Sequence, residues 1–335
     1  MTLNPIFRDG LVLQAGKPVR IFGTGKGTVS ASLAGAKGEI VSESDGAWLL
    51  ELPPMSYGGP YELTVSLDGA VTVLHDVMVG EVLLLGGQSN MGFTLGDSRT
   101  DKACYPANDH VRHYFIDRME PSKTANAEGW VACTPEVAPS WSAIGYFAGH
   151  LLAEKRGCAV GLISCNQGAS SIQTWLPLEA LAAPELNVPD PLKHRDHFVP
   201  SFVWNRTSVL YNYMLATFAP YSVGNVVWYQ GESNTTPAEA AVYGRFLELL
   251  VENWRSLFRD EALPFEIIQI ADYDLRDDEG WHAVQDAQCA AAAKIDGAKL
   301  IVSRDVCESG EIHPPTKSRL CARIVDALEF AIRRE

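Results

Sequence analysis

Two hydrophobic patterns divide the chain near residue 80. Before that point, short runs of alternating or β-branched residues recur between clusters of Gly, Pro, Asp and Ser, as in PVRIFGT, GTVSASLAG, AWLLELPP and YELTVSLD. A period of two is that of a strand with one buried face, and closely spaced turn residues favour antiparallel neighbours. We therefore expect residues 1–80 to form a small antiparallel β-sandwich domain.

From residue 81 onward, apolar strand-like runs alternate with amphipathic stretches. The strand candidates are 81–87, 110–116, 159–165, 224–230, 265–271 and 298–305, and the helix candidates are 142–157, 207–218, 237–258, 281–295 and 316–334. Such alternation predicts an α/β domain over 81–335, with a mostly parallel sheet that helices cover on both faces. Functional groups then gather at the carboxyl ends of the strands, and residues 176–202 are expected to form a long loop near that edge.

Composition narrows the possible partners. The formal net charge of −14 argues against nucleic acid or anionic lipid, and no apolar run is long enough to cross a membrane. The opening MTLNPIFRDG lacks the basic and apolar regions of a secretory signal, and the 7 cysteines are odd in number and scattered. These features predict a cytoplasmic protein, or a secreted or periplasmic one if a signal has been removed; they do not indicate an oligomeric state.

Polar residues follow two of the predicted strands at the point where each ends. In GGQSNM, two glycines allow a tight turn, and Ser89 then starts a helix whose N-terminus stabilises negative charge; the alternative is that Ser89 and Asn90 only cap that helix. In CNQGASSIQTW, Gly168 stands where a backbone N–H could point into the same cleft as an oxyanion donor, or it is an ordinary turn glycine.

Two further blocks complete the pattern. In WYQGESNT, the residues Gln230, Glu232 and Asn234 form either a cleft-lining cluster or a buried hydrogen-bonded network. In EIHPP, His313 precedes a Pro-Pro pair and a helix, which distinguishes it from the other 7 histidines. Taken in chain order, the four blocks supply a nucleophile, oxyanion donors and a base.

GGQSNM, QGASSIQTW, WYQGESN and IHP..K resemble the sequence blocks of the sialate O-acetylesterase family, a branch of the SGNH hydrolases related to acetylxylan esterases. The resemblance extends over nearly the whole chain, from FRDGLVLQAGKPVRIFGTG onward. It implies a flavodoxin-like three-layer domain that removes O-acetyl groups from a sugar without metal or cofactor. Ser89 would be the nucleophile and His313 the base. The N–H groups of Ser89 and Gly168, with a group from the Gln230–Glu232 segment, would line the oxyanion hole. Gln88, Asn90 and Asn234 are further candidates for oxyanion or substrate binding.

The sequence departs from the broader SGNH pattern at Gly310, where many of these enzymes carry an aspartate that orients the histidine. Candidates for that function are Glu232, Glu311 and Asp305. We favour Glu232, because related acetylxylan esterases use the glutamate of the matching block. Glu311 is second, since two residues apart in extended backbone place both side chains on one face.

Several other interpretations stay open at this stage. A carbohydrate-binding protein that has lost its chemistry would fit the missing acid, and a thiol enzyme would use Cys165 or Cys307, although neither has a setting that lowers a thiol pKa. Gly96-Asp97-Ser98 spells the start of another SGNH block but is expected to be a surface turn. Four aromatic residues could stack on sugar rings or belong to the core: Trp175, Trp204, Trp228 and Tyr229.

Overall fold

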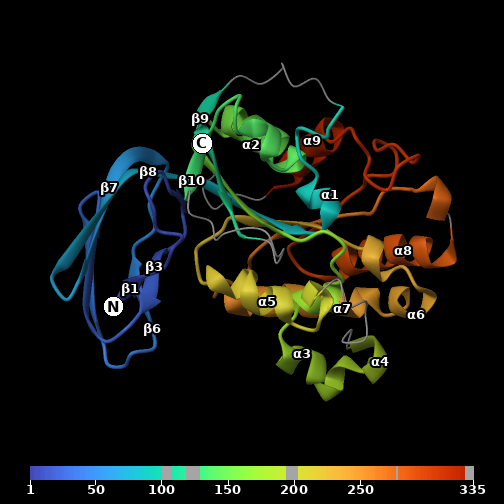
Figure 1. Ribbon diagram of the computed structural model, residues 1–335, viewed down its shortest axis with the longest axis horizontal. Coiled ribbons are helices and arrows are strands. Elements are labelled where there is room, and N and C mark those ends of the chain that lie inside the picture. Colours follow the sequence, from blue (N-terminus) through green and yellow to red (C-terminus); the bar gives the residue numbers. More distant parts are fainter. Residues whose placement is uncertain (100–106, 118–128, 194–202, 277, 329–335) are drawn as a thin grey trace.

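The structure is a computed structural model that describes residues 1–99, 107–117, 129–193, 203–276 and 278–328 (Figure 1). Its strands are β1 (Thr2–Leu3), β2 (Val12–Gln14), β3 (Val19–Thr24), β4 (Gly27–Leu33), β5 (Ala36–Ser42), β6 (Ala47–Leu52), β7 (Gly58–Leu67), β8 (Ala70–Gly87), β9 (Asn108–Phe115), β10 (Trp130–Cys133), β11 (Val160–Asn166), β12 (Asn225–Tyr229), β13 (Phe265–Ile268) and β14 (Ala298–Ile301). Its helices are α1 (Ser89–Gly92), α2 (Ala143–Arg156), α3 (Leu178–Ala182), α4 (Asp190–Lys193), α5 (Val209–Tyr213), α6 (Pro237–Ala240), α7 (Tyr243–Leu257), α8 (Glu279–Lys294) and α9 (Ser318–Ala327).

The N-terminal region consists of two groups of strands. The strands β1, β3 and β6 form an antiparallel sheet, while β5, β4, β7 and the first half of β8 pair in that order, also antiparallel. The two groups pack on one another, since a Cβ built at Gly38 of β5 would lie 3.0 Å from a methyl of Leu52 in β6. Alternation along β4, with Val29, Ala31 and Leu33 buried, matches the period of two in the sequence.

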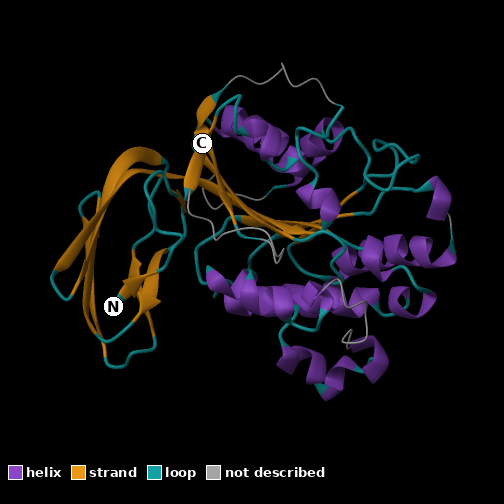
Figure 2. Ribbon diagram, in the orientation of Figure 1, coloured by secondary structure: helices purple, strands orange, loops and turns teal. Residues whose placement is uncertain are grey.

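The strand β8 joins the two regions, because its 18 residues run through position 80 without a break. Its first half pairs with β7, and its second half pairs with β11 and β12 in the large sheet (Figure 2). The boundary that we expect at residue 80 therefore lies inside a continuous strand. Across the junction, Lys17 forms an ion pair of 2.7 Å with Asp260, and Arg112 donates to the carbonyl oxygens of Gly10 and Asp76.

The second region is a mostly parallel sheet with the order β10-β9-β11-β8-β12-β13-β14, in which only β10 runs antiparallel to its neighbour. The helices α2 and α9 cover one face, and α5, α7 and α8 cover the other (Figure 1). Successive residues of β8 serve the two faces in turn. Leu83 and Leu85 belong to the core under α2 and α9, while Val82 and Leu84 belong to the core under α7 and α8. Burial on both faces explains why this strand is a continuous apolar run.

The predicted elements agree with the structure where apolar runs are long, and differ where they are short. All six strand candidates and four of the five helix candidates are present, the last of them as α9 up to the end of the described residues. The remaining helix candidate, 207–218, consists of the short helix α5 followed by a 3₁₀ turn at Leu215–Thr217. The expected loop at 176–202 carries α3 and α4 in its described part, and β10 was not predicted. The helix expected to start at Ser89 is the single turn α1. Among the described helices, none has the length and apolar character needed to span a bilayer.

Candidate active site

The carboxyl end of β8 approaches the neighbouring strand β12 more closely than a side chain would allow. A Cβ built at Gly87 would lie 2.1 Å from the carbonyl oxygen of Tyr229, and its φ of 131° is one that glycine adopts freely. At Gly86, a Cβ would stand 3.0 Å from the ring of Trp228. The two glycines thus let β8 turn against β12, and the turn delivers Ser89 to the first position of the one-turn helix α1.

Ser89 and His313, which are 224 residues apart in the sequence, meet at this strand end. The Nε2 atom of His313 lies 2.8 Å from the Oγ atom of Ser89, and both residues are partly exposed. His313 comes from the loop between β14 and α9. That loop is held from two sides, because Ser98 donates to the carbonyl oxygen of Pro315 at 2.8 Å and Asn90 donates to that of Ile312 at 2.9 Å. The sequence prediction that these segments converge is matched by this geometry.

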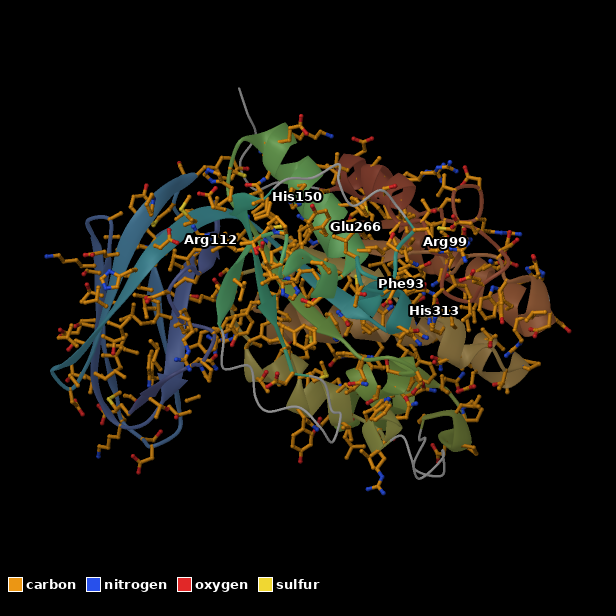
Figure 3. The ribbon with its side chains drawn as sticks, turned by 45° about the horizontal axis from the view of Figure 1, so that its top comes forward. Phe93, Arg99, Arg112, His150, Glu266 and His313 are labelled. Carbon is orange, nitrogen blue, oxygen red and sulfur yellow. The ribbon has the colours of Figure 1, made fainter. Side chains whose placement is uncertain are left out.

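The surroundings of His313 favour the neutral imidazole. Partial burial lowers its pKa below the usual value, the positive charge of Lys317 lowers it further, and the carboxylate of Glu311 acts in the opposite direction. The ring of Phe93 lies 6.0 Å from the imidazole, centroid to centroid, and Figure 3 shows the two side chains next to one another. A neutral imidazole can accept the proton of a hydroxyl group, so the pair has the arrangement of a nucleophile and its base.

Gly168 leaves space beside the serine. A Cβ built at Gly168 would lie 3.8 Å from the Cβ of Ser89, so the two backbones are adjacent. Among the described residues, neither the N–H of Ser89 nor that of Gly168 donates a hydrogen bond. The carbonyl oxygen of Gly168 accepts a bond of 3.0 Å from the indole of Trp204, which fixes the turn after β11. Two adjacent N–H groups without an acceptor are what an oxyanion site requires.

Glu232 does not contact the imidazole. Within the described part of the chain, the hydrogen bond of His313 goes to Ser89, and Glu232 instead accepts from the Nδ2 atom of Asn90 at 2.5 Å. The Oδ1 atom of Asn90 accepts in turn from the Nζ atom of Lys317 at 2.7 Å. Burial raises the pKa of Glu232, while the Asn90 hydrogen bond and the charge of Lys317 oppose that rise. The expected direct contact between Glu232 and His313 is therefore absent from this geometry, and the two are connected only through Asn90.

The other candidate acids point elsewhere as well. Glu311 is exposed and forms an ion pair with Arg99, and Asp305 pairs with Arg323 at 2.6 Å. Gly310 lies in open space, because nothing stands within 4 Å of a Cβ built there. Among the described residues, then, no carboxylate bonds to the imidazole, and the serine and histidine form a dyad in this geometry.

Three of the remaining candidates face the interior. Gln230 and Asn234 are bonded to one another at 2.8 Å, and Gln230 also donates to the carbonyl oxygen of Ser170. Asn234 accepts from the N–H of Ile172 and donates to Gln173. Gln88 accepts from two N–H groups of the Gly231–Ser233 turn. These bonds correspond to the buried network that the sequence left open as an alternative, so the side chains join the ends of β8, β11 and β12 in the interior.

The expected surface turn at Gly96-Asp97-Ser98 and the four aromatic residues that could stack on sugars agree only in part with the structure. Gly96 and Asp97 form the expected exposed turn, but Ser98 is buried against the histidine loop, so the prediction of a surface turn is wrong for the serine. Trp175, Trp228 and Tyr229 are fully buried and belong to the core, whereas Trp204 is half-buried beside Gly168.

The cysteines give no support to a thiol enzyme. Burial raises the pKa of both Cys165 and Cys307, which disfavours a thiolate, and the described residues contain no disulfide. Cys104 lies outside the described residues. The described part of the chain also holds no cluster of three or more His, Cys, Asp or Glu side chains that could bind a metal.

The sequence analysis predicts no function for Lys317, although this residue ends the IHP..K block. Its Nζ atom is buried, lies 5.1 Å from the ring centre of Phe93 and 5.3 Å from that of Tyr229, and bonds to Asn90. A lysine four residues after the histidine was visible in the sequence, but its burial was not. Only the packing of α9 against the strand ends turns this side chain inward.

Comparison with known proteins agrees with the geometry. The sequence profile of a family described as "carbohydrate esterase, sialic acid-specific acetylesterase" matches residues 79–327. The sialate O-acetylesterases of mouse and human are each 27% identical to the chain; the alignments cover 90% and 94% of it and 68% of each relative. The crystal structure of a carbohydrate acetylesterase from Xanthomonas citri superimposes with a TM-score of 0.84 at 27% identity, over 97% of this chain and 74% of that one. The family match takes in Ser89, Gly168 and His313 with the sheet that carries them, and the chain belongs to this family of sialic acid-specific carbohydrate acetylesterases.

Proposed function

We propose that the protein is a carbohydrate O-acetylesterase that hydrolyses acetyl esters on sugars through a serine acyl-enzyme. The observation that carries this proposal is the hydrogen bond of 2.8 Å between Ser89 and His313, beside two N–H groups that lack an acceptor. Membership in the acetylesterase family and the names of the relatives support acetylated sugars as the substrate class.

The reaction follows in two steps. His313 takes the proton of Ser89 as the serine oxygen bonds to the acetyl carbon, and the N–H groups of Ser89 and Gly168 stabilise the oxyanion that forms. The intermediate collapses, the bond to the sugar oxygen breaks, and that oxygen receives the proton from His313. Water then attacks the acetyl-enzyme with His313 again as the base, which releases acetate and restores Ser89.

The architecture of the region after residue 80 supports an SGNH-type hydrolase domain. When the parallel strand β9 at the far side of β11 is left aside, the strands β11-β8-β12-β13-β14 read 2-1-3-4-5 in chain order, which is the flavodoxin-like order. The point where that order reverses lies between β8 and β12, and Ser89 follows β8 there. We propose that residues 1–80 form a β-sandwich accessory domain, which is joined to the hydrolase domain through β8.

A substrate screen tests the proposal. Acetate release would be measured with O-acetylated sialic acids, acetylated xylo-oligosaccharides and acetylated hexoses, for the wild type and for Ser89→Ala. We expect at least one class to be turned over, with a loss of about 10⁴-fold or more in Ser89→Ala. Ser98→Ala is the matched control, because the hydroxyl of Ser98 donates to the carbonyl oxygen of Pro315 on the histidine loop, and this variant is expected to retain turnover.

The outcomes of the screen separate the alternatives. Turnover confined to xylo-oligosaccharides would identify an acetylxylan esterase. Binding of acetylated sugar without Ser89-dependent release would identify the carbohydrate-binding protein and contradict the proposal.

A further inference from the structure

A buried chain of three polar side chains runs behind the catalytic pair. Lys317 donates to Asn90 at 2.7 Å, and Asn90 donates to Glu232 at 2.5 Å. Lys317 has no exposed surface, and the second carboxylate oxygen of Glu232 is buried without a hydrogen-bond partner among the described residues. A buried ammonium and a buried carboxylate are costly to desolvate. A protein that keeps both groups at the ends of its strands therefore calls for a functional explanation.

Two aromatic rings lie beside the ammonium, and one of them also lies beside the imidazole of His313. Phe93 presents its ring to the Nζ atom of Lys317 at 5.1 Å and to the imidazole of His313 at 6.0 Å, while Tyr229 lies 5.3 Å from the same Nζ atom. The charged and titratable groups that face Lys317 are Glu232 from the turn after β12, Cys307 and Glu308 from the histidine loop, and Cys321 from α9. Burial lowers the pKa of Lys317 to about 8, and these neighbours oppose that shift.

Two physical links connect this chain to His313. One is mechanical, because the Nδ2 atom of Asn90 that bonds to Glu232 also donates to the carbonyl oxygen of Ile312, the residue before the histidine. The other is electrostatic. Lys317 and Glu311 are the charged groups that act on the imidazole, and Arg99 offsets Glu311 from outside.

We propose that Lys317 is a positioning residue for His313: its buried ammonium places a positive charge beside the ring of Phe93, which also lies next to the imidazole, and through Asn90 it holds the histidine loop against Ser89. Glu232 supplies the counter-charge that makes burial of the ammonium tolerable. This inference rests on the proposed esterase function. It gives Glu232 an indirect function, in place of the direct contact with the imidazole that a triad would need.

The test compares the pH dependence of kcat/KM for an activated acetyl ester in four proteins: wild type, Lys317→Met, the double variant Lys317→Met/Glu232→Gln, and Glu311→Gln. The double variant replaces both buried charges with neutral groups of similar size, so it folds even if Lys317→Met, which strands a buried carboxylate, does not. We expect the acidic limb to move to higher pH in both lysine variants, and to lower pH in Glu311→Gln, where the opposing carboxylate is removed.

A structural function alone would lower activity equally at every pH. In the lysine variants, we therefore expect the activity relative to wild type to be several-fold lower at about pH 5.5 than at about pH 7.5. Limbs that coincide with wild type in the folded lysine variants would overturn the inference. Titration of the His313 ring by NMR gives the same test without turnover. In the wild type, its resonance should show a second inflection near pH 8, where Lys317 loses its proton; a single inflection would likewise contradict the inference.

These readouts separate this inference from the proposed function. If the wild type releases no acetate, or if Ser89→Ala is as active as wild type, the proposed function fails. If the wild type is a Ser89-dependent esterase and the limbs do not move, only the inference about Lys317 fails.

Discussion

Ser89 and Asn90 are neighbours in one turn of helix, yet their side chains belong to different regions of the molecule. Ser89 is partly exposed and bonds to the imidazole, whereas Asn90 is buried and joins Lys317, Glu232 and the histidine loop. In the proposed mechanism, the two residues of this short motif have different functions: Ser89 supplies the reacting oxygen, and Asn90 holds the histidine loop in place. Each of the following changes addresses one side of this division, from the largest expected effect to the smallest.

His313→Ala removes the proposed base, which bonds to Ser89. We expect kcat for an acetyl ester to fall by about 10³-fold or more, because the serine then has no group to take its proton, while thermal stability stays close to that of wild type. Steady-state kinetics and a melting curve check both parts. A loss of less than tenfold, with Ser89 still required, would mean that another group is the base.

Asn90→Ala removes the buried side chain that joins Lys317, Glu232 and the histidine loop. The substitution deletes three hydrogen bonds and leaves Lys317 and Glu232 without the residue that joins them, so we expect the free energy of unfolding to drop by about 2–4 kcal/mol. Urea denaturation measures this drop. Ser98→Ala is the matched control, because it removes one bond to the same loop from the other side and should cost about 1 kcal/mol. An equal drop in the free energy of unfolding for the two variants would contradict the inference that Asn90 joins the buried charges to the histidine loop.

Glu232→Gln distinguishes a counter-charge from a triad acid. The amide oxygen of glutamine can still accept from Asn90, so we expect turnover at neutral pH to fall by less than about tenfold. An acid that orients the imidazole directly would cost about 10⁴-fold. Glu232→Ala, which leaves Asn90 without its acceptor, should be less stable than Glu232→Gln. If Glu232→Gln is as inactive as His313→Ala, the result would contradict the counter-charge function and support a direct contact between Glu232 and the imidazole during the reaction.

Gly310→Asp sharpens the comparison with the smallest change. Position 310 is open, so the aspartate fits without strain, and we expect stability to change by no more than about 0.5 kcal/mol. The wild-type acidic limb of kcat/KM should lie below about pH 6.5, since burial and Lys317 lower the pKa of His313. An added carboxylate near the imidazole should move that limb to higher pH. An unchanged limb would show that residue 310 does not reach the imidazole.

The sequence was most informative where a long apolar run ended in polar residues. Burial on both faces makes β8, β11 and β12 unmistakable, and the polar residues after them had to lie at one edge of the sheet. The sequence could not tell which of those residues turn inward. Gln230 follows β12 directly, and Glu232 and Asn234 belong to a 3₁₀ turn after Gly231. Their directions depend on that turn and on partners from distant segments, such as Gln173 and Asn90.

Length explains the other differences. The four-residue strand β10 is too short to produce a period in the sequence, so it was not predicted. The helix expected at Ser89 is present, but the sequence did not indicate that it is only one turn long. The continuity of β8 past residue 80 was hidden because its first half is mostly exposed and mixes polar with apolar residues, whereas its second half is buried and, apart from Glu81, apolar or glycine. A change of pattern therefore marks a change of surroundings, and it need not mark the end of a strand.

Covalent labelling tests the central claim, that Ser89 is the nucleophile and His313 its base. The wild type, His313→Ala and Ser89→Ala would be treated with a fluorophosphonate, which reacts with activated serines, and the adduct would be mapped by peptide mass spectrometry. We predict one adduct on Ser89 in the wild type, greatly slowed labelling in His313→Ala, and none in Ser89→Ala. An adduct on another residue that abolishes turnover, or full turnover after labelling of Ser89, would contradict the account.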